Sequence, residues 1–550
     1  MTASRVWTPP WMAFLLLLSL LTACHDSPHD PSRHGDDDAT EQTWTENDTD
    51  LHEDDRDAEE AVRNEAFRPQ THFSPRNGWM NDPNGLVYFQ DEYHLFFQHA
   101  PEGFLTSGMH WGHAVSRDLV HWDELPIALY PDAELGNVYS GSAVVDRNNT
   151  SGLCQDAESG DDSCLVLLFT HSGGKVGGQK QSLAYSLDKG RSWIPYPQNP
   201  VLLPPEGQKD FRDPKVFWHD ATSRWIMALA AKDQISFYHS PNLRQWTFLS
   251  DFIKDAADET GMWECPDLFK LATAETPPQE KWVMVVSVFS GGPQGGSGVR
   301  YFIGNFDGQS FQSETPPATP LWLDAGSDFY AWQSWSEAPE GKRLGIAWMN
   351  NWSYALGIKT EPWQGAMTTP RELVLREFPG LGLRVVQQAA SGLDTLRGES
   401  LLSESNQSVD GETEWLRVGW EKPLEIRLTL DPGQSQTAGI VFSAGSDSRL
   451  SLGYDRTSQR LFLERNATKA VKLPDSFAAR YETALEPVQD RIILRILKDR
   501  SAIEIFSDDG RLAMTEQVFP DSATDTLSLF AHGGIAVFEN VDVRALHSIW

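Results

Sequence analysis

The chain has 550 residues, of which 40% are hydrophobic and 11% aromatic, and a formal net charge of −33. This length predicts two or three domains. So acidic a chain is unsuited to nucleic acid, whose phosphates require a basic surface, and a neutral ligand fits better than an anionic one. The 21 Trp residues suit stacking on sugar rings, although we expect most of them to fill the core of an all-β protein.

Residues 1–24 predict an export signal. Arg5 supplies a positive charge, and residues 11–21 form an apolar run that is short for a membrane-spanning helix. The run is followed by Thr, Ala and Cys24, which resembles a bacterial lipobox. By that resemblance Cys24 is lipidated and anchors an exported protein to a bacterial membrane, at the cell surface or in the periplasm. An ordinary signal peptide cut nearby is the alternative.

Residues 25–66 contain sixteen acidic residues against three Arg, and few apolar residues. Such a segment buries too little apolar surface to offset the entropy that is lost on ordering. We therefore expect a disordered acidic tether that spaces the folded part from the membrane, with a specific acidic recognition tail as the alternative.

The chain has four Cys residues. Besides Cys24, Cys154 and Cys164 flank a polar loop, and export permits their oxidation, so we predict a disulfide between them. Cys265 is left unpaired, and no Cys or His spacing around it fits a metal site.

From residue 67 to 385, short strands alternate with turns rich in Gly, Pro, Asn and Asp. A faint repeat, Ser-x-x-Leu-x-x-Trp, occupies residues 116–122 and 240–246, with a looser copy at 186–193. Successive copies start 70 and then 54 residues apart, which suits one four-stranded blade each. The predicted fold class is therefore all-β, with a five-bladed β-propeller favoured over a large sandwich in this region.

We place a linker at residues 386–400 and a C-terminal β-sandwich at 401–550. Apolar and polar residues alternate at 424–430 and 492–497, as in strands with one buried face. The turn sequence SDDG after Phe506 predicts a hairpin. No catalytic cluster is evident in this region, so we expect a module that packs against the first domain, with a carbohydrate-contacting module as the alternative.

The sequence NDPNG at residues 81–85 is dense in turn-forming residues. It predicts a turn that places Asp82 at the mouth of a hairpin formed by residues 86–97. Two further motifs pair an acid with a proline, RDP at 212–214 and ECP at 264–266. In a propeller the inner strands converge on one axis, so we expect these acids to meet there.

Three carboxylates with an Arg and nearby Trp residues are suited to glycoside cleavage. One carboxylate attacks the anomeric carbon, and another protonates the leaving oxygen and later activates water. Crowding of carboxylates helps to keep one of them protonated near neutral pH. A calcium site is the competing interpretation, but the adjacent Arg212 argues against a metal. No phosphate loop, dinucleotide glycine pattern or zinc spacing is found, so we expect no cofactor.

From about residue 70 to Trp550 the chain resembles glycoside hydrolase family 32, the β-fructofuranosidases. The resemblance is carried by Trp79–Gly85, Phe211–Lys215, Trp263–Leu268, Met109–His113, Tyr139–Val144, Asp328–Ala331 and Pro370–Leu373. It implies a five-bladed propeller with a C-terminal sandwich, and a retaining mechanism.

By motif position, the resemblance implies that Asp82 is the nucleophile that forms a covalent fructosyl-enzyme, and that Glu264 is the general acid/base. It also implies that Asp213, helped by Arg212, holds the fructosyl hydroxyls and stabilises the transition state. The implied substrate-binding residues are Trp79, Asn81, Gln98, Trp111, Tyr139, Ser140, Arg212 and Trp348. Two residues depart from the family pattern: Tyr139 replaces the usual Phe, and Trp332 replaces a small residue and is expected to narrow the entrance.

The Gly-rich stretch at residues 291–298 and the stretch 301–308 resemble exo-acting levanases and inulinases of the family more than its intracellular sucrose hydrolases. Export agrees, because a polymer must be cut outside the cell. We therefore expect an exo-fructanase that releases fructose from levan or inulin and also splits sucrose. A sucrose-specific invertase, a fructosyltransferase and an inactive fructan-binding lipoprotein are the alternatives.

Overall fold

A computed structural model describes most of the chain. It covers residues 63–104, 106–160, 163–316, 320–444, 448–465, 473–474, 477, 479–520 and 526–550. The predicted export signal, with Cys24, and the tether up to residue 62 lie outside the described residues. Among the described residues, no helix is long and apolar enough to cross a membrane.

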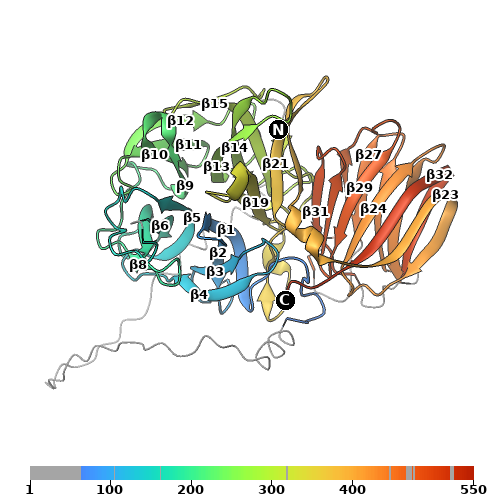
Figure 1. Cartoon of the computed structure of the whole chain (residues 1–550), viewed down its shortest axis with the longest axis horizontal. Coiled ribbons are helices and arrows are strands. Elements are labelled where there is room, and N and C mark those ends of the chain that lie inside the picture. The colour runs from blue at the N-terminus through green and yellow to red at the C-terminus, as the bar shows by residue number, and fades with distance from the viewer. Residues whose placement is uncertain are drawn as a thin grey trace, which may run out of the picture. The chain divides into compact units, whose positions relative to one another are not determined.

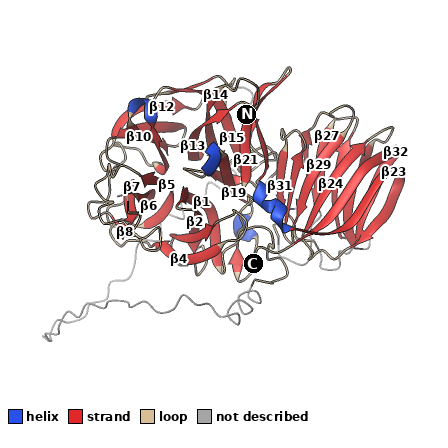
Figure 2. Ribbon diagram, in the orientation of Figure 1, coloured by secondary structure: helices blue, strands red, loops and turns tan. Residues whose placement is uncertain are grey.

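Five sheets of four or five strands follow one another along the chain as the blades of a propeller, as predicted (Figures 1 and 2). Blade 1 comprises β20 (Trp363–Gln364), β1 (Gly78–Phe89), β2 (Glu92–Ala100), β3 (His110–Ser116) and β4 (Asp123–Leu129). Blade 2 comprises β5 (Asn137–Asp146), β6 (Cys164–Ser172), β7 (Gln179–Ser186) and β8 (Ile194–Pro195). Blade 3 comprises β9 (Arg212–His219), β10 (Arg224–Ala230), β11 (Gln234–Ser240) and β12 (Thr247–Ile253).

The remaining two blades complete the ring. Blade 4 comprises β13 (Trp263–Ala272), β14 (Glu280–Val288), β15 (Gly298–Phe306), β16 (Phe311–Ser313) and β17 (Leu321–Trp322). Blade 5 comprises β18 (Tyr330–Ser334), β19 (Arg343–Trp348), β21 (Arg371–Phe378) and β22 (Gly382–Ala389). The helical elements are short 3₁₀ turns: η2 (Asp220–Thr222), η3 (Pro339–Gly341), η4 (Ala355–Gly357) and η5 (Ser391–Leu396).

Apolar side chains on the faces of the blades pack between neighbouring sheets. Val144 and Val166 of blade 2, for example, share one buried cluster with Val216 and Met227 of blade 3. The ring closes where Ser336, just after β18, exchanges backbone hydrogen bonds of 2.9 and 3.0 Å with β1. β20 also pairs with β1 in parallel. Each blade therefore depends on its neighbours to bury its surface.

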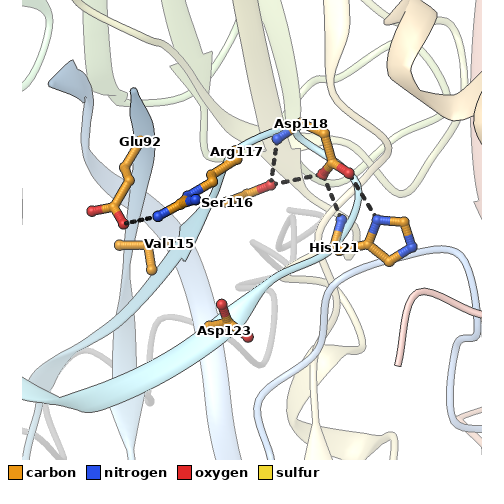
Figure 3. Close-up of a pocket in the computed structure, with 7 residues that line it drawn as sticks. All are labelled: Glu92, Val115, Ser116, Arg117, Asp118, His121 and Asp123. Atoms are coloured by element: carbon orange, nitrogen blue, oxygen red, sulfur yellow. Dashed lines mark hydrogen bonds and ion pairs between the residues drawn. The ribbon is translucent and has the colours of Figure 1, made fainter. Parts of the chain in front are cut away.

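The Ser-x-x-Leu-x-x-Trp repeat forms the turn between the third and fourth strands of a blade. In blade 1 the Ser116 hydroxyl donates to Asp118 Oδ1 at 3.0 Å, and the same oxygen accepts the backbone N–H group of His121 (Figure 3). It also accepts the backbone N–H group of Val120. This turn lines a cavity of about 330 Å³. Such side-chain-to-backbone bonds stabilise a turn independently of the rest of the fold. The equivalent pairs are Ser186 with Asp188 at 2.8 Å and Ser240 with Asn242 at 3.3 Å.

The predicted disulfide joins Cys154 to Cys164, whose Cα atoms are 5.2 Å apart. Both residues are buried in the cluster shared by blades 2 and 3. The crosslink closes the loop between β5 and β6 and reduces the conformational freedom of the unfolded chain.

The predicted turn at residues 81–85 is wrong, because these residues are part of β1. The pairing with β2 shifts in register between Met80 and Pro83, and again between Asn84 and Val87, so the strand is bulged on both sides of Asn84. The turn-forming residues coincide with these bulges, which re-aim side chains without ending the pairing.

The C-terminal region forms one hydrogen-bonded sheet of ten strands that closes into a sandwich-like layer structure. The first half of β32 pairs with β25 and its second half with β24, so this one strand serves both layers. The strands are β23 (Arg397–Arg417), β24 (Leu424–Asp431), β25 (Thr437–Ala444), β26 (Ser448–Asp455), β27 (Arg460–Arg465), β28 (Ala479–Ala484), β29 (Ile492–Lys498), β30 (Ala502–Ser507), β31 (Ala513–Gln517) and β32 (Thr526–Leu546).

Two predicted boundaries are corrected by packing. β22 continues to Ala389, and β23 already begins at Arg397, so the connection is shorter than the predicted linker. The predicted tether extends to residue 66, but the folded part already includes Arg63. This residue is buried, pairs with Glu124 at 2.8 Å and lies 3.9 Å over the ring of Trp550.

Buried ion pairs join the propeller to the sandwich. Arg371 of blade 5 binds both Asp324 and Glu504, and all three side chains are fully buried. His72 lies between two carboxylates of the sandwich, 2.8 Å from Asp499 and 2.9 Å from Glu504. Removing one member of such a group leaves an uncompensated buried charge, so the contact constrains how the two domains pack.

We expect the stabilising contribution of His72 to be lost at alkaline pH. Burial by itself lowers the pKa of His72, but the hydrogen bonds and charges of Asp499 and Glu504 outweigh it and raise the pKa to about 9. A group whose pKa is raised on folding stabilises the folded state fully below its unfolded pKa, and this stabilisation is lost as pH rises through the folded pKa. The window is therefore pH 6.5 to 9.

The measurement is urea unfolding of wild type and His72→Gln at stepped pH. The stability advantage of wild type should shrink by on the order of 3 kcal/mol across this window. Lys498, whose pKa burial lowers to about 7, is present in both proteins and largely cancels in the difference. An advantage that is constant from pH 6.5 to 9 would contradict the assignment.

Candidate active site

The first strands of the five blades bring the predicted acids together. β1, β5, β9, β13 and β18 contact one another around the centre of the propeller (Figure 1). They carry, in that order, Asp82, Ser140, Asp213, Glu264 and Tyr330. Together with Cys265 and Arg212, their side chains form one network of hydrogen bonds and ion pairs, although up to 248 residues separate them in the sequence, from 82 to 330.

Asp82 accepts hydrogen bonds from neutral donors. The Ser140 hydroxyl donates to its Oδ2 at 2.7 Å, and the Asn81 amide donates to its Oδ1 at 2.9 Å. Asn81 is itself oriented by the indole N–H of Trp79 at 2.8 Å. Burial raises the pKa of Asp82; the two hydrogen bonds oppose this rise, and the negative charge of Glu264 adds to it. The carboxylate is thus oriented without being neutralised by an ion pair.

Asp213 and Cys265 lie in the first strands of neighbouring blades, β9 and β13, and both have left-handed backbone angles, with φ of 62° and 44°. Such angles are strained for residues with a side chain and occur often at functional sites. They allow the Cys265 N–H to donate to Asp213 Oδ2 at 3.0 Å, while the Asp213 N–H donates to Thr170 Oγ1 at 3.0 Å. Burial raises the pKa of Asp213 to about 7, although the nearby Arg212 lowers it.

The Cys265 sulfur lies between two of the carboxylates, 3.5 Å from Asp82 Oδ2 and 3.7 Å from Asp213 Oδ2. Burial raises the pKa of this thiol well above its usual value, and the neighbouring carboxylates add to the rise. Cys265 therefore acts as a neutral S–H donor that separates two acids, and not as a reactive thiolate.

Glu264 has a different environment from Asp82. Arg212 donates to Glu264 Oε1 from Nε at 3.1 Å and from Nη2 at 2.9 Å, and the Tyr330 hydroxyl donates to Oε2. Arg212 is held by Asp210 at 2.8 Å and by Gln179 at 3.3 Å. Burial lowers the pKa of Arg212, but the charges of the acids outweigh it, so the guanidinium stays charged.

This arrangement provides two carboxylates in distinct chemical settings, with a third beside them. Asp82 is free of ion pairs and suited to attack, whereas Glu264 is held by a cation and a hydroxyl. Within the described residues, no group of three or more His, Cys, Asp or Glu side chains is placed to hold a metal ion.

The three Trp residues that were predicted to bind substrate are buried in the structure. Trp79, Trp111 and Trp348 are 1%, 0% and 0% exposed, so they present almost no surface to a ligand and form the packed wall behind the acids. Trp111 contributes a hydrogen bond from its indole to the Tyr139 carbonyl at 3.1 Å. Of the other predicted residues, Tyr139 is partly exposed, and Gln98 is buried and donates to the Val138 carbonyl at 3.1 Å.

The prediction that Trp332 narrows the entrance to the site is wrong. Trp332 is fully buried between blades 4 and 5, where its ring packs on Phe269 at 5.6 Å. The absence of a side chain at Gly345 makes room for it, because a Cβ there would lie 2.1 Å from the ring. The large residue therefore fills the core between these two blades.

Sequence reasoning missed several partners of the acids. Tyr330 is part of a stretch that resembles the family, but its bond to Glu264 was not predicted. Thr170 and Gln179 belong to strands of blade 2 without a recognisable motif. Their role depends on how blade 2 meets blade 3, which a linear pattern does not contain.

Comparison with known proteins assigns both domains to the same protein family. The family model for the glycosyl hydrolases family 32 N-terminal domain matches residues 72–388, and that for the family 32 C-terminal domain matches residues 393–545. A levanase of Bacillus subtilis (strain 168) is 44% identical over 503 residues, which cover 90% of this chain and 72% of the levanase.

Fungal proteins are also similar along nearly their full length. An extracellular exo-inulinase of Aspergillus niger is 36% identical over 518 residues, covering 88% of this chain and 95% of the inulinase. The crystal structure of the exo-inulinase from Aspergillus awamori superposes with a TM-score of 0.82 at 34% identity, covering 89% of this chain and 100% of that chain.

Proposed function

The chain belongs to glycoside hydrolase family 32, and from that premise we propose that it is a retaining, exo-acting hydrolase of terminal β-D-fructofuranosyl residues in fructans and sucrose. The observation that carries the proposal is the set of Asp82, Asp213 and Glu264, which three blades bring into one network of hydrogen bonds and ion pairs through Cys265 and Arg212.

In the proposed first step, a carboxylate oxygen of Asp82 attacks the anomeric carbon of the terminal fructosyl unit. The bond from that carbon to the leaving oxygen breaks, and Glu264 gives this oxygen a proton. A covalent fructosyl-enzyme results. In the second step Glu264 takes a proton from water, the water oxygen bonds to the anomeric carbon, and Asp82 is released.

Differences in environment support these roles. The hydrogen-bond donors to Asp82 include the Ser140 hydroxyl and the Asn81 amide, which are neutral. Among the described residues, no ion pair therefore competes for the negative charge with which Asp82 attacks. Glu264 is approached by Arg212 and Tyr330, two donors that orient a carboxyl group which must both give and take a proton. Asp213 is buried beside them and is assigned to the hydroxyls of the fructosyl unit and to the positive charge of the transition state.

The substrate assignment rests on charge and on relatives. The net charge of −33 suits a neutral sugar better than an anionic one. The levanase of B. subtilis and the exo-inulinases of Aspergillus are named for polymeric fructans and are similar over most of this chain. We therefore place levan and inulin first and sucrose second among the substrates.

We also propose, from the sequence alone, that the protein is exported and lipid-anchored through Cys24. Mass spectrometry of the membrane fraction should find Cys24 as a diacylated N-terminal residue, and Cys24→Ala should release the protein into the soluble fraction. A mature N-terminus at another residue without lipid would contradict the anchor and indicate an ordinary signal peptide.

Asp82→Asn should lower hydrolysis of every fructoside by about three orders of magnitude or more, because the amide does not form the covalent intermediate. Glu264→Gln should lower kcat by about 10²- to 10⁴-fold, and less for substrates with good leaving groups. The measurement is kcat with sucrose and with an activated fructoside. Near wild-type turnover by Asp82→Asn would refute its role, and an unchanged pH profile in Glu264→Gln would refute the acid/base assignment.

Product analysis tests the activity itself. A soluble fragment from residue 63 onward, incubated separately with levan, inulin and sucrose, should release fructose alone from the polymers from the earliest time points. Oligosaccharides at early times would indicate endo cleavage, and hydrolysis of sucrose alone would indicate an invertase. Longer products from sucrose would indicate fructosyl transfer, and no product from any substrate would indicate a fructan-binding protein.

A further inference from the structure

The inner strands of blades 3, 4 and 5 carry bulges at corresponding positions. The register of pairing shifts within residues 212–215 of β9, 264–267 of β13 and 330–333 of β18. Each bulge includes a residue other than glycine with a left-handed backbone: φ is 62° at Asp213, 44° at Cys265 and 53° at Ala331. Such conformations are strained and persist only where the surrounding structure fixes them.

Lys215 joins the three strands immediately after their bulges. Its ammonium group donates to Asp267 Oδ2 at 3.0 Å, to the Ser334 carbonyl at 2.9 Å and to Gln333 Oε1 at 3.3 Å. The Ser334 N–H donates to the same Asp267 oxygen at 2.8 Å. All four residues are buried. We call Lys215, Asp267 and Gln333 the strand clamp.

Gln333 extends the strand clamp to the bulge beside Glu264. Its side-chain amide donates to the carbonyl of Cys265 at 3.1 Å and to that of Pro266 at 3.2 Å. The Cys265 N–H in turn donates to Asp213 Oδ2 at 3.0 Å. One buried amide therefore fixes the two residues that follow Glu264 and, through Cys265, an oxygen of Asp213.

The ion pair in the strand clamp is directed wholly into the protein. The side chains of Lys215 and Asp267 are 5% and 0% exposed. Asp267 Oδ1 is buried and has no hydrogen-bond partner among the described residues, so the carboxylate is held through Oδ2. Replacing a buried ion pair by apolar side chains is often neutral or stabilising, so stability alone does not explain this pair.

We propose that Lys215 and Gln333 are positioning residues, which hold the bulges of the inner strands so that Glu264 and Asp213 meet the substrate in the reactive geometry. The inference rests on the proposed function and adds two residues to that same site. Both side chains are buried and act through the backbone and through Asp267. A displacement of a catalytic group by about 1 Å can lower the rate about 10²-fold, so the effect of such residues is measurable.

The first test compares two leaving groups. Glu264 gives a proton to the leaving oxygen of sucrose, whereas an activated fructoside needs this proton less. Gln333→Met keeps the size of the side chain and leaves the ion pair of the strand clamp intact. It should lower the ratio of kcat/KM for sucrose to kcat/KM for the activated fructoside about tenfold or more. This ratio does not depend on the fraction of folded enzyme, so an unchanged ratio would overturn the proposal.

Lys215→Met should lower the same ratio about tenfold or more, because it removes three hydrogen bonds of the strand clamp. Lys498→Met is the matched control, since Lys498 is also a buried lysine but donates to the carbonyls of Trp420 and Lys422 in the sandwich, both at 2.6 Å. The ratio should stay constant in this control, and an equal fall there would overturn the proposal.

A double variant tests whether the two residues act together. Lys215→Met combined with Gln333→Met should lower the ratio no further than the more severe single variant, because both residues hold the same bulges. Losses that multiply would mean two independent effects and would overturn the single strand clamp.

Thiol labelling tests the strand clamp without turnover. In a Cys24→Ala background, Cys265 is the only Cys outside the disulfide between Cys154 and Cys164. It is buried and should react slowly with a chromogenic disulfide reagent, but about tenfold or more faster when Gln333→Met or Lys215→Met loosens its strand. Labelling of both variants no faster than that of Lys498→Met would overturn the proposal.

The two proposals fail in distinguishable ways. If wild type hydrolyses no fructoside, the proposed function is wrong, and thiol labelling still decides whether the strand clamp holds the strand of Cys265. If wild type hydrolyses fructosides but the kinetic ratio and the labelling rate are the same in the variants as in wild type, only the positioning role is refuted.

Discussion

Mutual repulsion of buried carboxylates is the constraint on which the rest of this structure depends. Asp82, Asp213 and Glu264 meet at the centre of the propeller, where burial and the negative charges of neighbouring acids raise the pKa of Asp82 and of Asp213. Arg212 offsets part of this cost, and the Cys265 sulfur separates two of the acids as a neutral donor. The propeller keeps these mutually repelling acids together because its inner strands are fixed by close packing between neighbouring blades.

The sandwich contributes to the same constraint from outside the propeller. Residues 324–328 run beside β31, with backbone bonds from Ala325 to Ala513 at 2.8 Å and from Asp328 to Thr515 at 3.1 Å. Asp328 is also bound by Arg465 at 2.7 Å. The chain then enters β18, whose first residue is the hydroxyl partner of Glu264. The second domain thus supports the strand that orients the proposed acid/base.

Features decided by local chemistry were predictable from the sequence, and features decided by packing between blades were not. The Ser116 turn is made by bonds within a few residues, so its repeat identified the blades. Residues 81–85 have turn chemistry, but pairing with β2 overrides it and makes a bulged strand. The burial of Trp348 depends on neighbours that only the folded ring brings together. The acids themselves were found because motifs mark them, whereas Thr170 has no motif.

The order in which the chain is synthesised has a consequence for when activity can arise. The proposed nucleophile is at residue 82, but its strand is closed into the ring by Ser336 and by β20, and His72 just before it is paired with residues 499 and 504. Contacts of such sequence separation form late and slowly. A nascent chain that extends past residue 264 but not to residue 504 therefore contains all three acids while it lacks the partners of His72, so we expect the active centre to form only after the last domain has folded onto the first.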